Sequence, residues 1–253
     1  MIRALAILLA LSAPAAAQTR GPDALTGREA LLGWEAVGRV DIGGEGFCTG
    51  ALIAPDLVLT AAHCLFRPDG TPVDAATITF RAGYVDGTEI AGSRVARAVP
   101  HPGYRTEGVE RLEQLRFDVA LLQLISAIPA ATAAPFAVAD PGVGADVSVV
   151  SYARGREEAP SWQRKCALKG RYAGVMAFDC DVTFGASGAP VFDLGAGGRA
   201  RIVAIVSAGV TEGRERLAFG AELPALVADI KSAMRRAGTV GLRGGTGAKF
   251  LKP

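Results

Sequence analysis

Three short segments of the chain carry side chains that could act together in hydrolysis. They are residues 60–64 (TAAHC), 117–122 (FDVALL) and 185–190 (GASGAP), and they supply His63, Asp118 and Ser187. A serine hydroxyl is a weak nucleophile at neutral pH unless a base lies within hydrogen-bond reach, and imidazole titrates close to that pH. A carboxylate beside the imidazole fixes its tautomer and orientation. We therefore predict a catalytic triad in which Ser187 attacks, His63 is the base and Asp118 orients it.

The glycines around the serine indicate how a negatively charged intermediate would be stabilised. Backbone N–H groups aimed at a developing oxyanion are each worth roughly 3 kcal/mol in the transition state. We expect the N–H groups of Gly185 and Ser187 to form this oxyanion hole. A Gly-x-Ser-x-Gly nucleophile elbow is the alternative, but Ala189 stands where that motif needs its second glycine, and the residue order differs. His63 could instead be a structural histidine, and Asp118 a turn residue.

The composition indicates a globular protein and argues against a nucleic-acid partner. The 253 residues are 50% hydrophobic and 21% charged, with a formal net charge of +2. A chain of this length can bury a core as one large β domain or as two small ones. Because the sequence has no cluster of Lys and Arg, this nearly neutral balance supplies no surface for a polyanion.

The first 17 residues have the pattern of a secretory signal peptide. A positive start at residues 1–3 precedes an apolar run at 4–11 and small residues at 15–17. The apolar run is shorter than the roughly 20 residues that span a bilayer, so we expect cleavage after Ala17 rather than an uncleaved anchor. Residues 18–35 have no clear period and are interpreted as a pro-segment or a surface arm. The mature protein is expected to be secreted or periplasmic, with no membrane contact after signal cleavage.

The cysteines are informative in an exported protein, because disulfides form in oxidising compartments. Four cysteines allow three pairings. Cys48 and Cys64 flank one apparent strand pair, and Cys166 and Cys180 flank another. Pairing each cysteine locally closes two loops of similar size, each stabilising by roughly 3 kcal/mol in the chain-entropy model. A zinc site is the alternative, but the chain has no Cys-x-x-Cys and only two histidines, so we expect no metal and no cofactor.

Short β runs broken by Gly, Pro and Asp fill most of the chain from residue 36 onward. Examples are residues 57–60, 76–80, 95–99, 119–124, 147–151 and 202–207. Strands at this spacing, with little helix between them, favour an all-β sandwich or barrel. Apolar residues repeat at helical spacing within residues 224–236, which predicts one amphipathic helix. Residues 238–253 have few apolar anchors and are expected to form a flexible tail.

These motifs together resemble those of the trypsin-like (chymotrypsin-fold) serine endopeptidases, in their bacterial secreted branch. Residues 101–104 (HPGY) add to the resemblance, since a similar loop precedes the catalytic aspartate in that family; His101 is interpreted as a surface-loop residue. The resemblance implies an all-β fold of two antiparallel six-stranded β-barrels packed around a cleft, with a C-terminal α-helix. The protease domain would span residues 36–237, and the barrels would join near residues 125–140.

The resemblance also implies what the protein does. His63 and Asp118 would lie in the first barrel and Ser187 in the second, and together they would hydrolyse peptide bonds through an acyl-enzyme. The partners would be polypeptide substrates, and we expect a monomer. The alternative from another class is a protease-like binding protein that keeps both barrels but has an idle site.

One departure from the family concerns activation. Vertebrate-type members have an aspartate immediately before the serine, which pairs with a newly freed N-terminus. Ala186 stands at that position here, and no Ile-Val-Gly-Gly start is present. Other contacts must therefore hold in place the loop that carries Gly185 and Ser187, which we call the oxyanion loop.

A second departure concerns substrate specificity. Asp181 lies six residues before the serine, at the position that attracts Arg or Lys in trypsin. However, Thr183 replaces a cysteine of the family's pocket wall, so a structural role for Asp181 stays open. The strand expected to line the specificity pocket, residues 203–209 (VAIVSAG), has no histidine. This disfavours the glutamate preference of some bacterial relatives. Substrate backbone is expected to pair with Ser207, Ala208 and Gly209 as an added strand.

Overall fold

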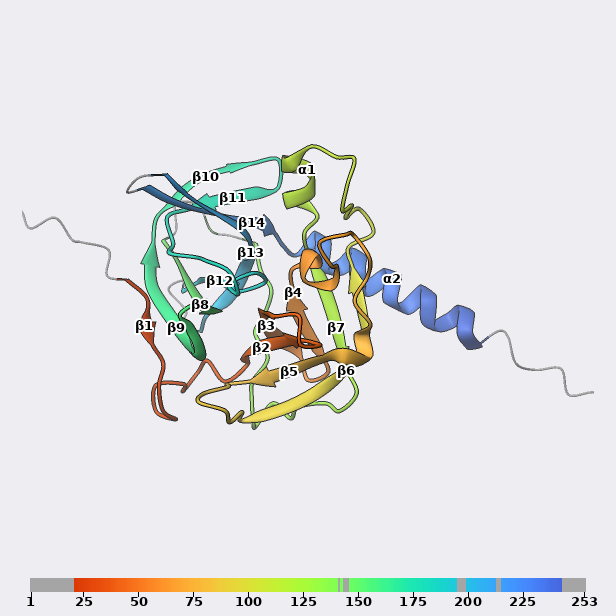
Figure 1. The fold of residues 1–253 in the computed structure, drawn as a ribbon, viewed down its shortest axis with the longest axis horizontal. Coiled ribbons are helices and arrows are strands. Elements are labelled where there is room, and N and C mark those ends of the chain that lie inside the picture. The colour runs from red at the N-terminus through yellow and green to blue at the C-terminus, as the bar shows by residue number, and fades with distance from the viewer. Residues whose placement is uncertain (1–20, 141, 143–145, 195–198, 213–214, 243–253) are drawn as a thin grey trace, which may run out of the picture.

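The N-terminal half of the chain closes into a six-stranded antiparallel β-barrel (Figure 1). The computed structural model describes residues 21–140, 142, 146–194, 199–212 and 215–242. Around the barrel the strands are β2 (Val37–Ile42), β3 (Phe47–Ala54), β4 (Leu57–Thr60), β7 (Ala120–Leu124), β6 (Ala91–Pro100) and β5 (Ile78–Ala82). In β5, Ile78, Phe80 and Ala82 are buried and the residues between them are half-buried, as expected for a strand with one face on a core.

The second half forms an antiparallel sheet of eight strands. In spatial order they are β1 (Asp23–Ala24), β9 (Arg156–Cys166), β8 (Val147–Ala153), β12 (Pro190–Asp193), β13 (Arg201–Glu212), β14 (Glu215–Glu222), β11 (Val175–Phe178) and β10 (Leu168–Tyr172). Ala167 alone separates β9 from β10, so these two act as one bent strand that joins the sheet's ends. With β1 as an added edge, six strands remain. The double-barrel architecture is confirmed.

The predicted C-terminal helix is also confirmed, and it is longer than expected. It is α2 (Ala225–Leu242), which continues beyond residue 236 into the start of the predicted tail. Its buried residues Val227, Ile230 and Met234 join the core cluster that fills the first barrel, and the helix contacts β6 and β7 (Figure 1). The rest of the tail, residues 243–253, lies outside the described residues. Neither described α-helix is both long and apolar enough to cross a bilayer.

The described part of the N-terminal segment packs on the body of the protein. β1 pairs with β9, and Leu25, Leu31 and Trp34 are buried. The Trp34 ring lies 4.8 Å from that of Trp162 and 5.0 Å from that of Phe192. Residues 21–35 therefore pack on the predicted protease domain through buried apolar side chains. They lack a period because single apolar side chains anchor a segment rich in turns. The predicted signal peptide, residues 1–17, lies outside the described residues.

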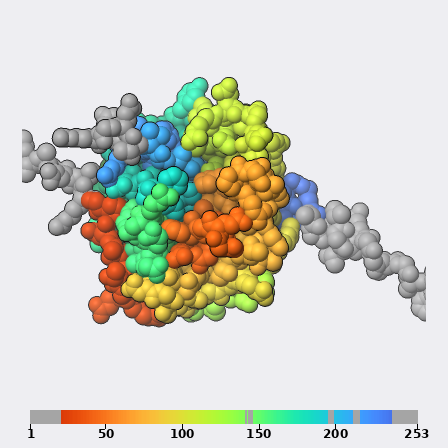
Figure 2. Space-filling view, in the orientation of Figure 1, coloured from red at the N-terminus to blue at the C-terminus, as the bar shows by residue number. Residues whose placement is uncertain are grey.

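The two β systems meet over a broad junction, and each contains one disulfide. β3 of the first barrel contacts β8 and β12 of the second, and Figure 2 shows the orange surface of the first against the green and teal surface of the second. Cys48 is bonded to Cys64, and Cys166 to Cys180, which is the local pairing that the sequence predicted.

Candidate active site

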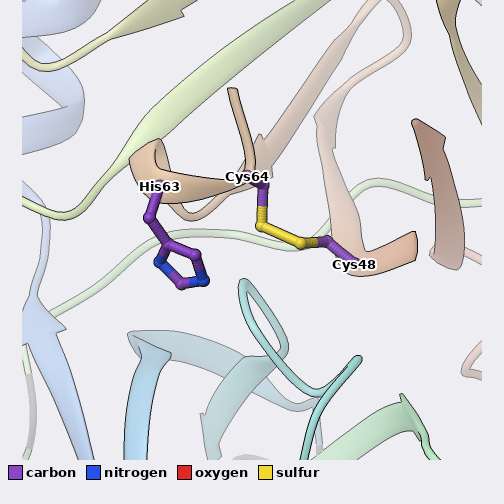
Figure 3. A group of neighbouring side chains, drawn as sticks. All are labelled: Cys48, His63 and Cys64. Atoms are coloured by element: carbon purple, nitrogen blue, oxygen red, sulfur yellow. A yellow bond between two sulfur atoms is a disulfide. The ribbon is translucent and has the colours of Figure 1, made fainter. Parts of the chain in front are cut away.

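His63 lies on a short turn that is cross-linked to the neighbouring strand. This 3-10 turn, η1 (Ala62–Leu65), follows β4, and its Cys64 is bonded to Cys48 of β3 (Figure 3). The disulfide therefore restrains the backbone next to the imidazole. The ligand atoms of these three side chains lie within 4.8 Å of one another. Because the two sulfurs are bonded together, only the His63 imidazole in this group remains free for proton transfer or ligation.

Asp118 reaches the same turn from the opposite direction. It follows α1 (Arg111–Arg116) and Phe117, just before β7, and it is 3% exposed. Its Oδ1 accepts a hydrogen bond from the backbone N–H of His63 at 2.8 Å, and its Oδ2 lies 2.7 Å from the imidazole Nδ1. A buried carboxylate is costly unless it is paired, and both of its oxygens are paired here.

The imidazole connects Asp118 to the serine. Its Nε2 lies 2.8 Å from the hydroxyl Oγ of Ser187. Because the carboxylate can only accept, Nδ1 must carry the proton and Nε2 presents its lone pair to the hydroxyl. Burial works to lower the pKa of His63, but the charge of Asp118 and the hydrogen bond to it outweigh that effect. The pKa of His63 is therefore raised above its ordinary value of 6.5.

Ser187 sits in a tight loop between two glycines with left-handed backbone. Gly185 has a φ of +92° and Gly188 a φ of +76°, which glycine tolerates best. The carbonyl oxygen of Phe184 accepts a hydrogen bond from the N–H of Arg154 at 2.7 Å. The N–H of Gly185 is on the other side of that peptide group and points away from Arg154. Within the described residues, the N–H groups of Gly185 and Ser187 have no acceptor, so both can donate to a ligand.

The three residues expected to pair with substrate lie on β13. Ala208 pairs with Phe219 and Gly209 with Ala218 of β14, on one side of the strand. On the other side, the pairing of β13 with β12 ends at Ile205. From Ser207 onward this edge of β13 has no paired strand within the described part of the chain, so a substrate strand could add there.

Asp181 is neutralised by an arginine distant in sequence. Its carboxylate forms an ion pair with Arg216 of β14, and its N–H donates to the Oε1 of Gln163 at 2.6 Å. Arg156 lies on its other side, with Nη2 3.5 Å from the Asp181 carbonyl oxygen. Burial lowers the pKa of Arg156, while the charge of Asp181 opposes that effect. No local motif marks Arg216, since it follows Asp181 by 35 residues.

A pocket of about 280 Å³ opens beside His63. Its lining residues are His63, Phe66, Arg67, Pro68, Gly70, Tyr104, Thr106 and Glu107. Burial, with a smaller contribution from the charge of Asp118, raises the pKa of Tyr104 to about 12. This hydroxyl therefore stays neutral at physiological pH. The pocket adjoins the imidazole that contacts Ser187.

His101 is not the surface-loop residue that the sequence suggested. It is 7% exposed and its ring stacks on that of Phe117, with 4.9 Å between the ring centroids. Its Nδ1 accepts a hydrogen bond from the N–H of Gly103 at 3.0 Å. The ring packs against the residue that immediately precedes Asp118, and its Nε2 lies 3.6 Å from Oδ2 of Asp229 on α2.

Comparison with known sequences finds a peptidase family and a serine protease that resemble this chain. The model of the trypsin-like peptidase domain family matches residues 48–205. The chain is also similar to the serine protease SP24D of Anopheles gambiae, with 37% identity over 110 residues. That alignment covers 43% of this chain and 37% of the relative, so the chain matches well under half the length of this curated relative.

Solved structures share the fold at low sequence identity. A Glu endopeptidase in complex with MPD superposes with a TM-score of 0.69 and 19% identity, covering 84% of this chain and 96% of that one. The protease Anisep of Arthrobacter nicotinovorans gives a TM-score of 0.63 and 15% identity, covering 79% and 94%. With two barrels, a His-Asp-Ser constellation and a family match over most of both barrels, the chain belongs to the trypsin-like peptidase family.

Proposed function

We propose that this protein is an exported serine endopeptidase that hydrolyses peptide bonds through an acyl-enzyme. The observation that carries the proposal is the continuous hydrogen-bonded line from Asp118 through His63 to Ser187, with links of 2.7 and 2.8 Å. These are the distances at which a base can take a proton from a hydroxyl. Membership of the trypsin-like peptidase family supports the same assignment.

In the proposed mechanism the three side chains act together with two backbone N–H groups. Ser187 Oγ attacks the carbonyl carbon of the substrate while Nε2 of His63 takes the hydroxyl proton, and Asp118 stabilises the imidazolium that forms. The negative oxygen of the tetrahedral intermediate accepts hydrogen bonds from the N–H groups of Gly185 and Ser187. The imidazolium then gives its proton to the departing amine. A water molecule, activated by the same imidazole, hydrolyses the acyl-enzyme and restores the serine.

Polypeptides are the proposed substrates. An extended peptide could add to the open edge of β13 at Ser207, Ala208 and Gly209 and place one side chain in the pocket beside His63. The two disulfides and the apolar start of the sequence support export to a secreted or periplasmic location. We propose that the enzyme acts as a monomer, without a cofactor.

Hydrolysis of a peptide library by the signal-free protein, beside a Ser187→Ala variant, tests this function. We expect the wild type to release new amino termini and the variant to lose a factor of at least about 10³ in kcat. A wild type that leaves the library intact while binding peptides tightly would favour the alternative, a protease-like binding protein. A fully hydrogen-bonded triad argues against that alternative, because binding alone needs no aligned nucleophile and base.

A further inference from the structure

We propose that Thr49 is a positioning residue that holds the oxyanion hole in its competent form. This inference rests on the proposed function, since an oxyanion hole matters only to an enzyme of this mechanism. Thr49 lies on β3 of the first barrel, has 0% exposure, and reaches across the junction to the loop that carries the nucleophile.

One residue holds the carbonyl groups of both proposed oxyanion donors. The Thr49 hydroxyl Oγ1 lies 2.8 Å from the carbonyl oxygen of Gly185, and the Thr49 backbone N–H donates to the carbonyl oxygen of Ser187 at 2.9 Å. The hydroxyl also accepts a hydrogen bond from the N–H of Tyr152 on β8 at 3.0 Å. Since that contact occupies a lone pair of Oγ1, the hydroxyl proton is directed to Gly185, the nearer of two carbonyl oxygens within reach.

These contacts fix the peptide groups on both sides of Gly185. On one side the Phe184 carbonyl accepts from the N–H of Arg154, and on the other the Gly185 carbonyl accepts from Thr49. The N–H of Ala186 completes the second group by donating to the carbonyl of Thr183 at 3.0 Å. Glycine is the residue with the most freedom to rotate, so a loop centred on it needs such anchors. With both anchors in place, the Gly185 N–H is held opposite the Phe184 carbonyl and is free of protein acceptors among the described residues.

The hydrogen bonds from Thr49 to Gly185 and Ser187 replace an ion pair that this sequence cannot form. Ala186 has no carboxylate, so the loop cannot be fixed by an ion pair at that position. The loop is instead held by Thr49, which belongs to the same barrel as His63. Thr49 follows Cys48, whose disulfide restrains the turn of His63. Two consecutive residues of β3 thus hold the base on one side and the oxyanion loop on the other.

A Thr49→Val variant tests the role of the hydroxyl, because valine keeps the shape of threonine and removes only the hydrogen bonds. We expect kcat on a good peptide substrate to fall about 10- to 100-fold with KM nearly unchanged. Loss of one oxyanion donor lowers kcat by about 10²–10³, and Thr49 acts on such a donor only through the loop. Thr49→Ser, which keeps the hydroxyl, should restore most of the loss. Thr77→Val, at an exposed threonine just before β5, is the control and should leave kcat unchanged.

Two further readouts separate a positioning role from a general loss of structure. The pH dependence of kcat/KM on its acid side reports His63 and should not move in Thr49→Val. A crystal structure of the variant, which requires no activity, should show the peptide groups around Gly185 rotated. Equal kcat in wild type and Thr49→Val, a serine variant as slow as the valine variant, or an unchanged loop would overturn the proposal. A wild type that cleaves nothing would overturn the proposed function instead, and the crystal structure would still decide whether Thr49 holds the loop.

Discussion

Asp118 accepts two hydrogen bonds from His63, one from its backbone N–H and one from its imidazole. The carboxylate therefore fixes the ring and the turn that carries it at the same time. Because Asp118 is buried just before the apolar strand β7, these two bonds also satisfy a charge that would otherwise be costly inside the protein. The orientation of the His63 imidazole and the local stability consequently depend on the same contact.

Replacement of Asp118 by asparagine should shift the pH profile as well as slow the reaction. In the wild type the pKa of His63 is raised, so kcat/KM should rise with pH through a midpoint above 6.5 as the imidazole loses its proton. In Asp118→Asn the charge that raises this pKa is gone and burial, which lowers it, remains. The midpoint should move to lower pH, and kcat at neutral pH should fall by a factor on the order of 10⁴. An unmoved midpoint in a pH–rate profile would contradict this account of the base.

Removal of the disulfide beside His63 should affect both stability and chemistry. Cys48→Ala/Cys64→Ala opens a link between residues 16 apart and should reduce the free energy of unfolding by roughly 3 kcal/mol in denaturant titrations. Cys166→Ala/Cys180→Ala, with a separation of 14, is the matched control and should cost about as much. Below both unfolding transitions, labelling by a small phosphonate should slow mainly in the first variant. Equal labelling rates would mean that the disulfide does not position the base.

Arg216 should determine whether the enzyme accepts basic residues before the scissile bond. In the wild type Arg216 neutralises Asp181, so we expect no strong preference for Lys or Arg. In Arg216→Ala the carboxylate is released, and kcat/KM for basic residues relative to neutral ones should rise about tenfold or more, as a charge-assisted hydrogen bond allows. Arg171→Ala, which removes a comparable ion pair with Glu222, should leave the library profile unchanged. A trypsin-like profile in the wild type would contradict the neutralisation of Asp181 by Arg216.

Gly188 should not tolerate a side chain. A Cβ there would clash with Thr60 Oγ1 and with the Thr49 carbonyl oxygen, and the φ of +76° disfavours L side chains in any case. Gly188→Ala should reduce the free energy of unfolding by roughly 3 kcal/mol or more. Gly87→Ala has a similar φ of +85° with open space around it and should cost only about 1 kcal/mol. Similar values for both variants in denaturant titrations would show that the serine loop can relax.

The core of the site could be predicted because each of its three side chains lies in a distinctive local segment. His63, Asp118 and Ser187 come from different parts of the chain, yet each is marked by its own neighbours, and the structure brings them within hydrogen-bond distance. Strand spacing likewise predicted an all-β fold, and the local pairing of the cysteines was correct.

The supporting residues could not be predicted, because their partners are distant in sequence. Thr49 meets Gly185 across 136 positions, and no pattern around either residue records that contact. The ion pair of Asp181 with Arg216 joins residues 35 positions apart and depends on where the β13–β14 pairing places Arg216. His101 sits in a polar, proline-containing segment that is typical of an exposed loop, and its burial comes with contacts to the distant residues Phe117 and Asp229.

Labelling of the signal-free, disulfide-intact protein with a fluorophosphonate probe tests the central claim most directly. The account predicts one modified peptide, with the probe on Ser187, and loss of that modification in Ser187→Ala and in protein unfolded beforehand. Mass spectrometry would locate the modified residue. Folded protein that takes up no probe, or that carries it on another residue, would contradict the assignment of Ser187 as the nucleophile.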